Sequence, residues 1–313
     1  MKYKDVVVTG GAGFIGSHIV DKLVEEQCQV TVIDSLVSGN LKFIEHLRDK
    51  IQFVKADIRD EDILQKICSK KDTIFHFAAD PDVRTSVTSP TNSFNVNVHG
   101  TFLILECMRR LKIPNIVFAS SGGTLYGQVD IFPTPEETPF RPISAYGATK
   151  AVAEAYLSAY AASYGITAVS CRYANIFGPR STHGVMIDFY NKLKKDAKKL
   201  EILGDGKQVK SYLYITDCVE ASLLAAKSVT KGYEAFNIGT ESWTTVKQIA
   251  DTITDELGLK KVKYSYTGGE AGWTGDVFKM LLSIDKLKKL GWTPKVSTEE
   301  GIRQYIRWLK QNS

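Results

Sequence analysis

A glycine-rich turn between an apolar strand and a helix constrains this chain more than any other feature. Val6-Val-Val8 predicts a short buried strand, Gly10-Gly-Ala-Gly-Phe-Ile-Gly16 follows it, and Ser17 to Val24 has helical spacing. The first glycine permits a tight turn, Gly13 lets the backbone approach a pyrophosphate, and Gly16 lets the helix press against the strand. The N-terminus of that helix would offer amides and a partial positive charge to a diphosphate.

An acidic residue completes this unit. Asp34 follows the next predicted strand, Gln29 to Ile33, at about the 20-residue distance from the glycine turn that is typical of dinucleotide-binding βαβ units. Its carboxylate would accept hydrogen bonds from the ribose hydroxyls of adenosine and would repel a 2′-phosphate. No arginine follows it immediately. The turn and the acid together predict a site for NAD rather than NADP.

Strands and helices alternate through the rest of the first half. Further strands are predicted at residues 51–55, 73–77, 115–119 and 166–173, and helices at residues 61–68, 93–111 and 144–164. This alternation predicts an α/β fold, a doubly wound parallel (Rossmann) sheet with ligands at the carboxyl ends of its strands. The alternation fades after residue 180. We expect an NAD-binding domain over residues 1–175 with a returning strand within 212–240, and a smaller mixed α/β substrate lobe over 176–313.

One of these helices carries a candidate base. Tyr146 and Lys150 are four residues apart, so they share one face of a helix. A neighbouring ammonium would lower the pKa of the phenol and make it a base near neutrality. Such pairs taken alone usually lie on an ordinary helix surface. The preceding segment, residues 120–144, is too long for a simple connection and is therefore predicted to be functional.

Composition excludes several classes of protein. No run of the 313 residues is long and apolar enough to span a membrane. The five cysteines are widely spaced without a CxxC pair, which predicts reduced core residues in a cytoplasmic protein and no metal site. The net charge of +5 is not accompanied by interleaved aromatics and arginines, so we expect an anionic small molecule as partner rather than nucleic acid.

Several motifs together resemble the extended short-chain dehydrogenase/reductase superfamily. The resemblance rests on the glycine turn, Asp57-Ile58, Phe77-Ala-Ala79, Asn97 and the Tyr146/Lys150 pair, and it runs along nearly the whole chain. Further motifs resemble its nucleotide-sugar epimerase/dehydratase branch, most closely the UDP-glucose 4-epimerases: Ser120-Ser-Gly-Gly-Thr-Leu-Tyr-Gly127, Arg172-Tyr-Ala-Asn-Ile-Phe-Gly-Pro-Arg180, Gly204-Asp-Gly206 and Gly275-Asp276 with Leu290-Gly-Trp292.

The resemblance implies an NAD-dependent epimerisation at C4 of a UDP-hexose through a 4-keto intermediate, with Tyr146 as the base and Asn175 at the sugar nucleotide. Asp57 and Ile58 would contact the adenine, and Ala78 and Ala79 would line the nicotinamide. The residues predicted to bind the cofactor are Gly10, Gly13, Phe14, Ile15, Gly16, Asp34, Ser35, Ser38, Gly39, Asp57, Ile58, Phe77, Ala78, Ala79, Asn97, Ser120, Tyr146, Lys150 and Tyr173.

The chain departs from the family pattern beside the base. The serine that assists the tyrosine in UDP-glucose 4-epimerases is replaced by Gly122, so Thr124 or Ser121 would supply that hydroxyl, with Thr124 slightly favoured. Family dehydratases carry Asp-Glu where this chain has Gly123 and Thr124. The resemblance therefore implies epimerisation rather than dehydration.

The residues expected to bind the diphosphate also depart from the family pattern. Family arginines correspond here to Lys210 and to Trp273, three residues before Asp276. Lysine binds phosphate without the bidentate fork of arginine, and tryptophan carries no charge. Arg180, Lys207 or Lys279 could compensate.

Two features leave the sugar open. Met280 replaces a bulkier family tyrosine near the C2 substituent, and Arg84 could meet a hexuronate carboxylate or form a structural ion pair. A UDP-N-acetylhexosamine or UDP-hexuronate epimerase is therefore one alternative. Because Gly122 and Trp273 replace the family serine and arginine, a non-catalytic NAD-binding relative is the other. The helices over 93–111 and 146–164 would pair in a homodimer.

Overall fold

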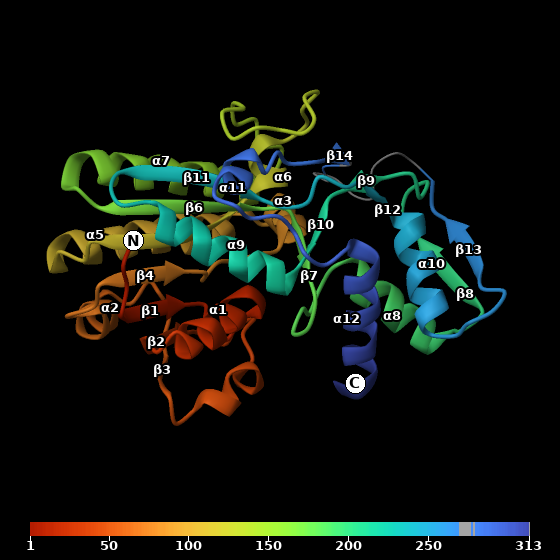
Figure 1. Cartoon of the computed structure of the whole chain (residues 1–313), viewed down its shortest axis with the longest axis horizontal. Helices are drawn as coiled ribbons and strands as arrows, with labels where there is room; N and C mark the ends of the chain where they lie inside the picture. Colours follow the sequence, from red (N-terminus) through yellow and green to blue (C-terminus); the bar gives the residue numbers. More distant parts are fainter. Residues whose placement is uncertain (269–276, 278, 313) are drawn as a thin grey trace.

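A seven-stranded parallel sheet forms the centre of the molecule, in the order β11-β6-β5-β4-β1-β2-β3 (Figure 1). The computed structural model describes residues 1–268, 277 and 279–312. The predicted doubly wound sheet is confirmed. Its strands are β1 (Asp5–Thr9), β2 (Gln29–Asp34), β3 (Ile51–Lys55), β4 (Thr73–His76), β5 (Asn115–Ser121), β6 (Thr167–Tyr173) and β11 (Tyr233–Ile238).

The strand order reverses beside β1, which pairs with β2 on one side and β4 on the other. Val6, Val7 and Val8 are fully buried, as expected of a strand covered on both faces. Thr9 lies opposite Ile33 on one neighbour and His76 on the other. The segments that follow these strands therefore emerge together at the switch point, where open α/β sheets bind ligands.

Helices cover both faces of the sheet (Figure 1). The buried apolar side chains of α2 (Glu61–Cys68), α5 (Gly100–Leu111) and α7 (Ala145–Tyr164) belong to one apolar cluster with the sheet. Those of α1 (Phe14–Glu25) and α9 (Ile215–Ser228) belong to the cluster on the other face. Two 3-10 turns lie between β2 and β3, η1 (Leu41–Phe43) and η2 (Glu45–Leu47).

Two segments differ from the prediction. The single helix expected over 93–111 is α4 (Pro90–Ser93), a π-helical turn η3 (Phe94–His99) and α5, preceded by α3 (Val83–Thr88). The segment predicted as a loop after β5 begins with a short helix, α6 (Gly122–Tyr126). Glycine is a poor helix former, but a Cβ at Gly122 would lie 2.4 Å from Leu282 Cδ1. Close packing therefore overrides propensity here.

The C-terminal half adds small strands and three longer helices, to the right in Figure 1. The short strands pair as β7 with β10, β8 with β13, and β9 with β12 and β14. Their bounds are β7 (Asn175–Phe177), β8 (Lys199–Ile202), β9 (Val209–Lys210), β10 (Tyr212–Tyr214), β12 (Thr244–Thr245), β13 (Lys263–Tyr266) and β14 (Lys279–Met280). The helices are α8 (Val185–Lys195), α10 (Val246–Glu256) and α12 (Thr298–Asn312), together with the short α11 (Asp285–Lys289).

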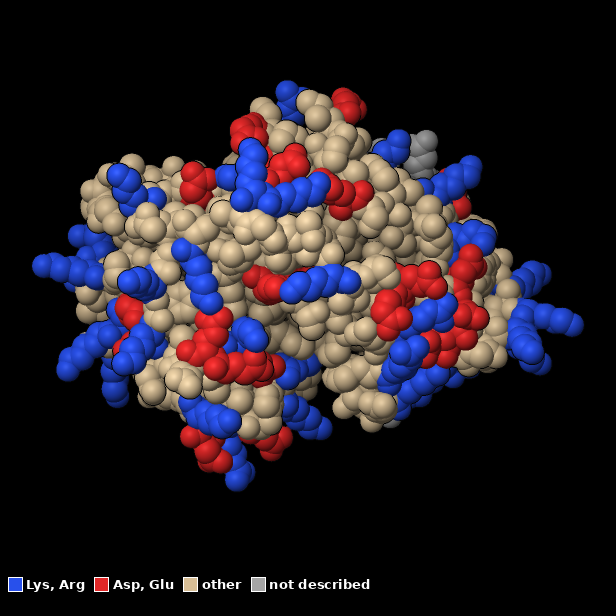
Figure 2. Space-filling view, in the orientation of Figure 1, with Lys and Arg blue, Asp and Glu red and all other residues tan. Residues whose placement is uncertain are grey.

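The surface carries charges of both signs. On the face drawn in Figure 2, Lys and Arg side chains stand among Asp and Glu. All five cysteines are free and buried. No helix within the described ranges is both long and apolar enough to cross a membrane.

Candidate active site

The glycine turn after β1 is held against two neighbouring strands. Gly10 has a φ of +69°, and its amide donates to Ile33 O over 2.8 Å. A Cβ added to Gly10 would lie 2.6 Å from Ala78 N, and one added to Gly16 would lie 2.2 Å from Gly10 O. Side chains at these two positions would collide with backbone, so the turn requires glycine.

The start of α1 can receive an anion. The helix begins at Phe14, directly after its N-cap residue Gly13, which has an extended conformation and no side chain to occupy the first-turn amides. Those amides and the helix dipole together form a site for a phosphate group. The cradle fits the diphosphate of a dinucleotide.

Asp34 lies at the end of β2 and is only 7% exposed. Its carboxylate accepts hydrogen bonds from Ala12 N (2.9 Å) and Leu36 N (2.8 Å). Burial raises the pKa of Asp34, and these two bonds oppose the rise. A Cβ on Gly39 would lie 2.6 Å from Asp34 Oδ1, so the loop closes on the carboxylate. The predicted residues Ser35 and Ser38 belong to this loop, half-buried and exposed respectively.

The residues predicted at the adenine end lie just after β3. Asp57 accepts two side-chain hydrogen bonds from Arg59, at 2.8 and 2.6 Å, and this lowers the pKa of Asp57. Ile58 is 4% exposed. A Cβ on Gly100 would lie 2.5 Å from Ile58 Cδ1, which places this side chain against the start of α5.

A buried histidine ties the end of β4 to its neighbours, and sequence reasoning missed it. His76 Nδ1 lies 2.7 Å from Thr9 Oγ1, and Nε2 lies 2.9 Å from Thr101 Oγ1. Thr101 donates its own proton to Asn97 O, so Nε2 carries the ring hydrogen and Nδ1 accepts from Thr9. Burial, and then Lys150, lower the pKa of His76 to about 3. The available signal was a polar ring within an apolar strand.

Asn97 joins three elements at the sheet edge. Its side-chain oxygen accepts from Asp80 N over 2.8 Å, and its amide donates to Asp80 O and, over 3.1 Å, to Thr149 Oγ1 of α7. The loop of residues 77–80, which contains the predicted Phe77, Ala78 and Ala79, is therefore fixed against the helix of the candidate base. The π-helical turn brings Asn97 into this position, consistent with the occurrence of such turns at functional sites.

Tyr146 and Lys150 lie on one face of α7, as predicted. Ser144 caps this helix by accepting from Gly147 N, and Tyr146 N donates to Ser86 Oγ of α3 over 3.0 Å. The Lys150 Nζ lies 5.6 Å from the centre of the Tyr146 ring and donates to Ala119 O over 2.8 Å. The pair is thus anchored to both α3 and the end of β5.

The protonation of this pair corrects the expectation from sequence. Burial raises the pKa of Tyr146 to about 12, with Asp80 contributing to the rise, and a hydrogen bond with Ser121 opposes the shift. Burial also lowers the pKa of Lys150 to about 8. Lys150 therefore does not lower the phenol's pKa below its ordinary value. The physical reason is that both groups leave water together, and burial penalises each charged form.

The hydroxyls beside Tyr146 form a short chain. Thr124 Oγ1 donates to Ser121 Oγ over 2.8 Å, and Ser121 lies near enough to Tyr146 for its hydroxyl to lower the pKa of the phenol. Ser121, rather than the slightly favoured Thr124, is thus the direct neighbour of the tyrosine, with Thr124 behind it. A Cβ on Gly123 would lie 2.7 Å from Met280 Sδ. The two glycines therefore leave space for side chains from the segment around β14.

The structure brings only some of the predicted substrate residues together. Asn175 in β7 donates to Ser211 O over 3.1 Å, next to Lys210 in β9, and Arg84 lies exposed on α3. Arg180 instead forms an ion pair with Asp21 of α1 over 2.7 Å. Trp273, Gly275 and Asp276 lie outside the described residues.

Two residues predicted to bind the cofactor are engaged elsewhere through their hydroxyls. Ser120 donates to Glu154 Oε1 over 2.5 Å, and Tyr173 shares a 3.0 Å hydrogen bond with Ser222 of α9. The Tyr173 ring stacks on Phe77 with ring centres 6.5 Å apart. Tyr173 could therefore support the cofactor pocket through Phe77.

Comparison with known proteins relates the whole chain to one family. The model of the NAD dependent epimerase/dehydratase family matches residues 6–239. A putative UDP-glucose 4-epimerase of Methanocaldococcus jannaschii is 40% identical over 317 residues, which cover 98% of this chain and 99% of the relative.

Solved structures show the same likeness. The UDP-glucose 4-epimerase of Thermotoga maritima, solved with UDP-glucose, has a TM-score of 0.91 and 37% identity, covering 98% of this chain and 99% of that one. The UDP-glucose 4-epimerase of Thermus thermophilus, solved with NAD, has a TM-score of 0.87 and 34% identity over the same shares. The similarity therefore includes both the sheet and the C-terminal lobe.

Proposed function

This chain belongs to the NAD-dependent epimerase/dehydratase family, and from that premise we propose that it interconverts UDP-glucose and UDP-galactose by epimerisation at C4. The observation that carries the proposal is the hydroxyl chain from Thr124 through Ser121 to Tyr146, with Lys150 beside it, at the carboxyl edge of the sheet. That arrangement suits removal and return of a hydroxyl proton.

The cofactor of this reaction is NAD. The glycine turn, the first-turn amides of α1 and Asp34 would hold its diphosphate and ribose, in a cradle that a Cβ at Gly10 or Gly16 would fill. When bound, NAD supplies the hydride acceptor for C4 and a positive ring charge that favours the phenolate of Tyr146. The Asp34 carboxylate would select NAD over NADP.

Tyr146 would act as the general base and then the general acid of the reaction. Its phenolate would take the proton from the C4 hydroxyl as the C4 hydride leaves, and the phenol would return it when hydride comes back to the opposite face. Ser121 donates to the phenolate oxygen, and Thr124 supports Ser121, so the negative charge gains a hydrogen bond at the atom where it forms. Lys150 would stay beside Tyr146 through its hydrogen bond to Ala119 O.

The short helix α6 argues against dehydration. Family dehydratases place carboxylates where this chain has Gly123 and Thr124. In the structure Met280 packs so closely on Gly123 that even a Cβ would lie 2.7 Å from its sulfur. A carboxylate side chain at that position would need Met280 to move.

We further propose how the substrate lobe works. Asn175 and Lys210, neighbours of Ser211 on β7 and β9, would contact the UDP moiety, and Arg84 would approach the sugar from α3. Trp273 and Asp276 complete this proposed set. The division into a cofactor domain over 1–175 with β11, and a substrate lobe over 176–313, is part of the same proposal.

Assembly and location are also proposed. Tyr156 and Tyr164 of α7 are 40% and 54% exposed, and the Tyr156 ring packs edge-on against Phe102 of α5 with ring centres 5.8 Å apart. An aromatic face of this kind on two adjacent helices suits a four-helix contact in a homodimer. The buried free cysteines support a cytoplasmic location. A role in galactose metabolism follows from the proposed substrates.

The direct test is conversion followed by proton NMR. Purified protein with NAD should convert UDP-galactose to UDP-glucose, with UDP-N-acetylgalactosamine and UDP-glucuronate as competing candidates in parallel tubes. Tyr146→Phe should lower the rate by about 10²- to 10⁴-fold, the range for loss of a general acid–base group. If only another UDP-sugar is converted, that sugar is the substrate. If none of the UDP-sugars is converted, the proposed epimerase activity is wrong.

A further inference from the structure

A third polar residue continues the face of α7 that carries the candidate base. Glu154 follows Lys150 by four residues, as Lys150 follows Tyr146, so the three side chains form one row along the helix. Glu154 is only 2% exposed. A buried carboxylate must be paired or fully hydrogen-bonded to remain charged, so its partners need an account.

Glu154 is surrounded by donors from three strands. Arg172 of β6 donates to both of its oxygens through Nε, at 3.1 Å each, and through Nη2 over 2.7 Å. Tyr233 of β11 donates to Oε2 over 2.6 Å, and Ser120 of β5 donates to Oε1 over 2.5 Å. The charge-assisted bond to Ser120 is of the short, strong kind.

The other side of Arg172 is also satisfied. Its Nη1 donates to Tyr126 OH and to Glu136 O, both over 2.7 Å. Arg172 is 4% exposed. The guanidinium is therefore fixed between α7 on one side and α6 with the segment after it on the other, and it cannot release Glu154 without leaving a buried charge unpaired.

The consequence falls on the end of β5. Lys150 Nζ donates to Ala119 O, and Glu154 accepts from the Ser120 hydroxyl. The next residue along the strand is Ser121, whose hydroxyl lowers the pKa of Tyr146. Ala119 and Ser120 are thus both hydrogen-bonded to the helix that carries the base. The end of β5 cannot shift relative to α7 while both hydrogen bonds are made.

We propose that Glu154, held by Arg172, is a positioning residue for catalysis: by fixing Ser120 it sets the distance between the Ser121 hydroxyl and Tyr146. This proposal rests on the proposed epimerase function. It assigns the buried ion pair a task beyond stability, because the Ser120 hydroxyl is the link through which the pair reaches the hydroxyl chain of Ser121 and Thr124.

The test compares two variants that each remove one hydroxyl donor from the same carboxylate. Ser120→Ala removes the donor on the strand end, whereas Tyr233→Phe removes the donor on β11 and leaves Ser120 in place. Ser120→Ala should lower kcat by about 10- to 100-fold, the loss expected for a displaced catalytic group, with KM for UDP-galactose and bound NAD near wild type. Tyr233→Phe should keep kcat within about twofold, because the catalytic geometry is retained.

The pH dependence provides a readout that loss of stability alone would not change. Tyr146 is faced by Ser121 from β5, by Lys150 on its own helix and by Asp80 from the loop after β4. A loosened Ser121 hydrogen bond raises the pKa of the phenol, so the acidic limb of kcat should move to higher pH in Ser120→Ala and not in Tyr233→Phe. Equal losses of kcat in the two variants, or wild-type kcat and pH profile in Ser120→Ala, would overturn the proposal.

A titration without turnover separates this proposal from the proposed function. The ultraviolet phenolate absorbance of the NAD-loaded protein, minus that of its Tyr146→Phe form, reports the ionisation of Tyr146 alone. In the Ser120→Ala background this difference titration should move to higher pH. If no sugar is converted but the shift appears, the epimerase proposal fails and the positioning stands; conversion without the shift gives the reverse.

Discussion

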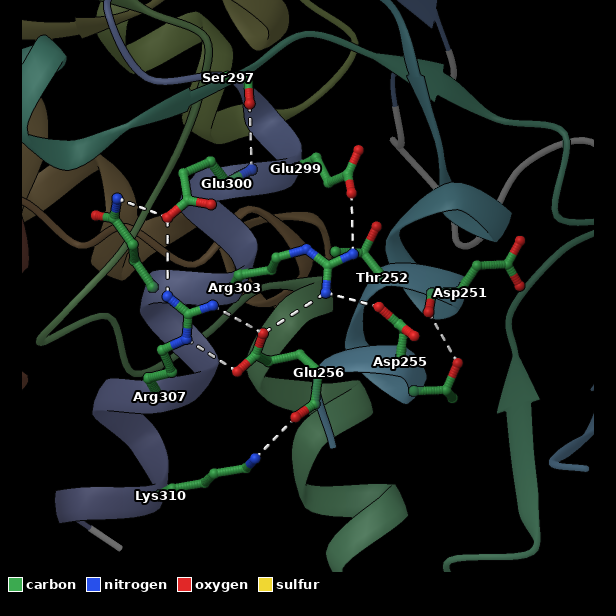
Figure 3. Close-up of polar contacts among 12 residues, drawn as sticks. Asp251, Thr252, Asp255, Glu256, Ser297, Glu299, Glu300, Arg303, Arg307 and Lys310 are labelled. Atoms are coloured by element: carbon green, nitrogen blue, oxygen red, sulfur yellow. Dashed lines mark hydrogen bonds and ion pairs between the residues drawn. The ribbon is translucent and has the colours of Figure 1, made fainter. Parts of the chain in front are cut away.

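Two clusters of arginine and carboxylate side chains show how burial changes what an ion pair does. In the buried cluster Arg172 and Glu154, whose side chains are 5% and 2% exposed, meet at 2.7 Å beside the candidate base. In the exposed seam between α10 and α12, Arg303 contacts Asp255 at 2.7 Å and Glu299 at 2.9 Å (Figure 3). The distances are nearly the same.

The surroundings differ much more than the distances. Asp255 and Glu299 are 69% and 66% exposed, so water already solvates them and competes with Arg303. Arg307, which bonds Glu256, is itself 53% exposed. The seam therefore adds little stability, whereas the buried pair has no water to replace a lost partner. The stability of the molecule therefore depends on the charges whose ion pair is buried, whatever the length of the pair.

The largest effect should come from breaking the buried pair. Arg172→Met should lower the free energy of unfolding by about 3–5 kcal/mol, because it leaves the Glu154 carboxylate buried without its cation. Urea denaturation followed by tryptophan fluorescence measures this. A loss below about 1 kcal/mol would place this pair in the class of exposed pairs.

A double variant separates the role of the buried pair in stability from its role in the rate. Adding Glu154→Leu to Arg172→Met removes both charges and should recover most of the lost stability. It should not recover the rate, because Ser120 still lacks its acceptor. Recovery of both would contradict a positioning role for Glu154.

A second, smaller effect is expected on mild acidification. The pKa of His76 is lowered to about 3, first by burial and then by Lys150, so between about pH 6.5 and 3 the unfolded state binds a proton that the folded state does not. Stability should therefore fall as pH falls below about 6.5, by up to about 1.4 kcal/mol per pH unit from this group. The stability that the exposed seam contributes is lost at lower pH. Arg307 lowers the pKa of Glu256, so this carboxylate keeps its charge until the pH falls below the ordinary carboxylate range.

Denaturation midpoints between about pH 7 and pH 5 test this order. His76→Asn should reduce the slope in that window without removing it, because burial also lowers the pKa of His18, to about 4. Glu256→Gln should leave the slope unchanged. A wild-type midpoint that stays constant down to about pH 5 would contradict the neutral state assigned to His76.

The smallest effect should come from the exposed seam. Arg303→Met should change the free energy of unfolding by no more than about 1 kcal/mol. The difference from wild type should shrink further as salt is added, since exposed charges are screened. A loss as large as that of Arg172→Met, or one insensitive to salt, would show that the two regions do not differ as the exposures indicate.

Much of the fold was predictable because its signals are local. The glycine turn, Asp34 and the alternation of apolar strands with helices predicted the sheet, and the four-residue spacing predicted the shared face of Tyr146 and Lys150. The helix over 61–68 was predicted with its observed bounds. Each of these features depends on neighbours in the chain or on helix periodicity.

The remainder depends on distant packing. Arg172 reaches Glu154 only because β6 pairs with β5 beneath α7, and no spacing in the sequence reports that. The short helix α6 forms from glycines because Leu282 packs against Gly122. The raised pKa of Tyr146 follows from burial, which the Tyr–Lys spacing could not indicate.

In the proposed reaction, hydride leaves C4 and returns to it within one site while Tyr146 moves the hydroxyl proton. UDP-galactose carrying deuterium at C4 tests it most directly, with NMR and mass spectrometry of the UDP-glucose formed in ordinary water. The product should keep deuterium at C4, and Tyr146→Phe should form almost no product. Product with the C4 deuterium replaced by solvent hydrogen, or Tyr146→Phe with the wild-type rate, would contradict it.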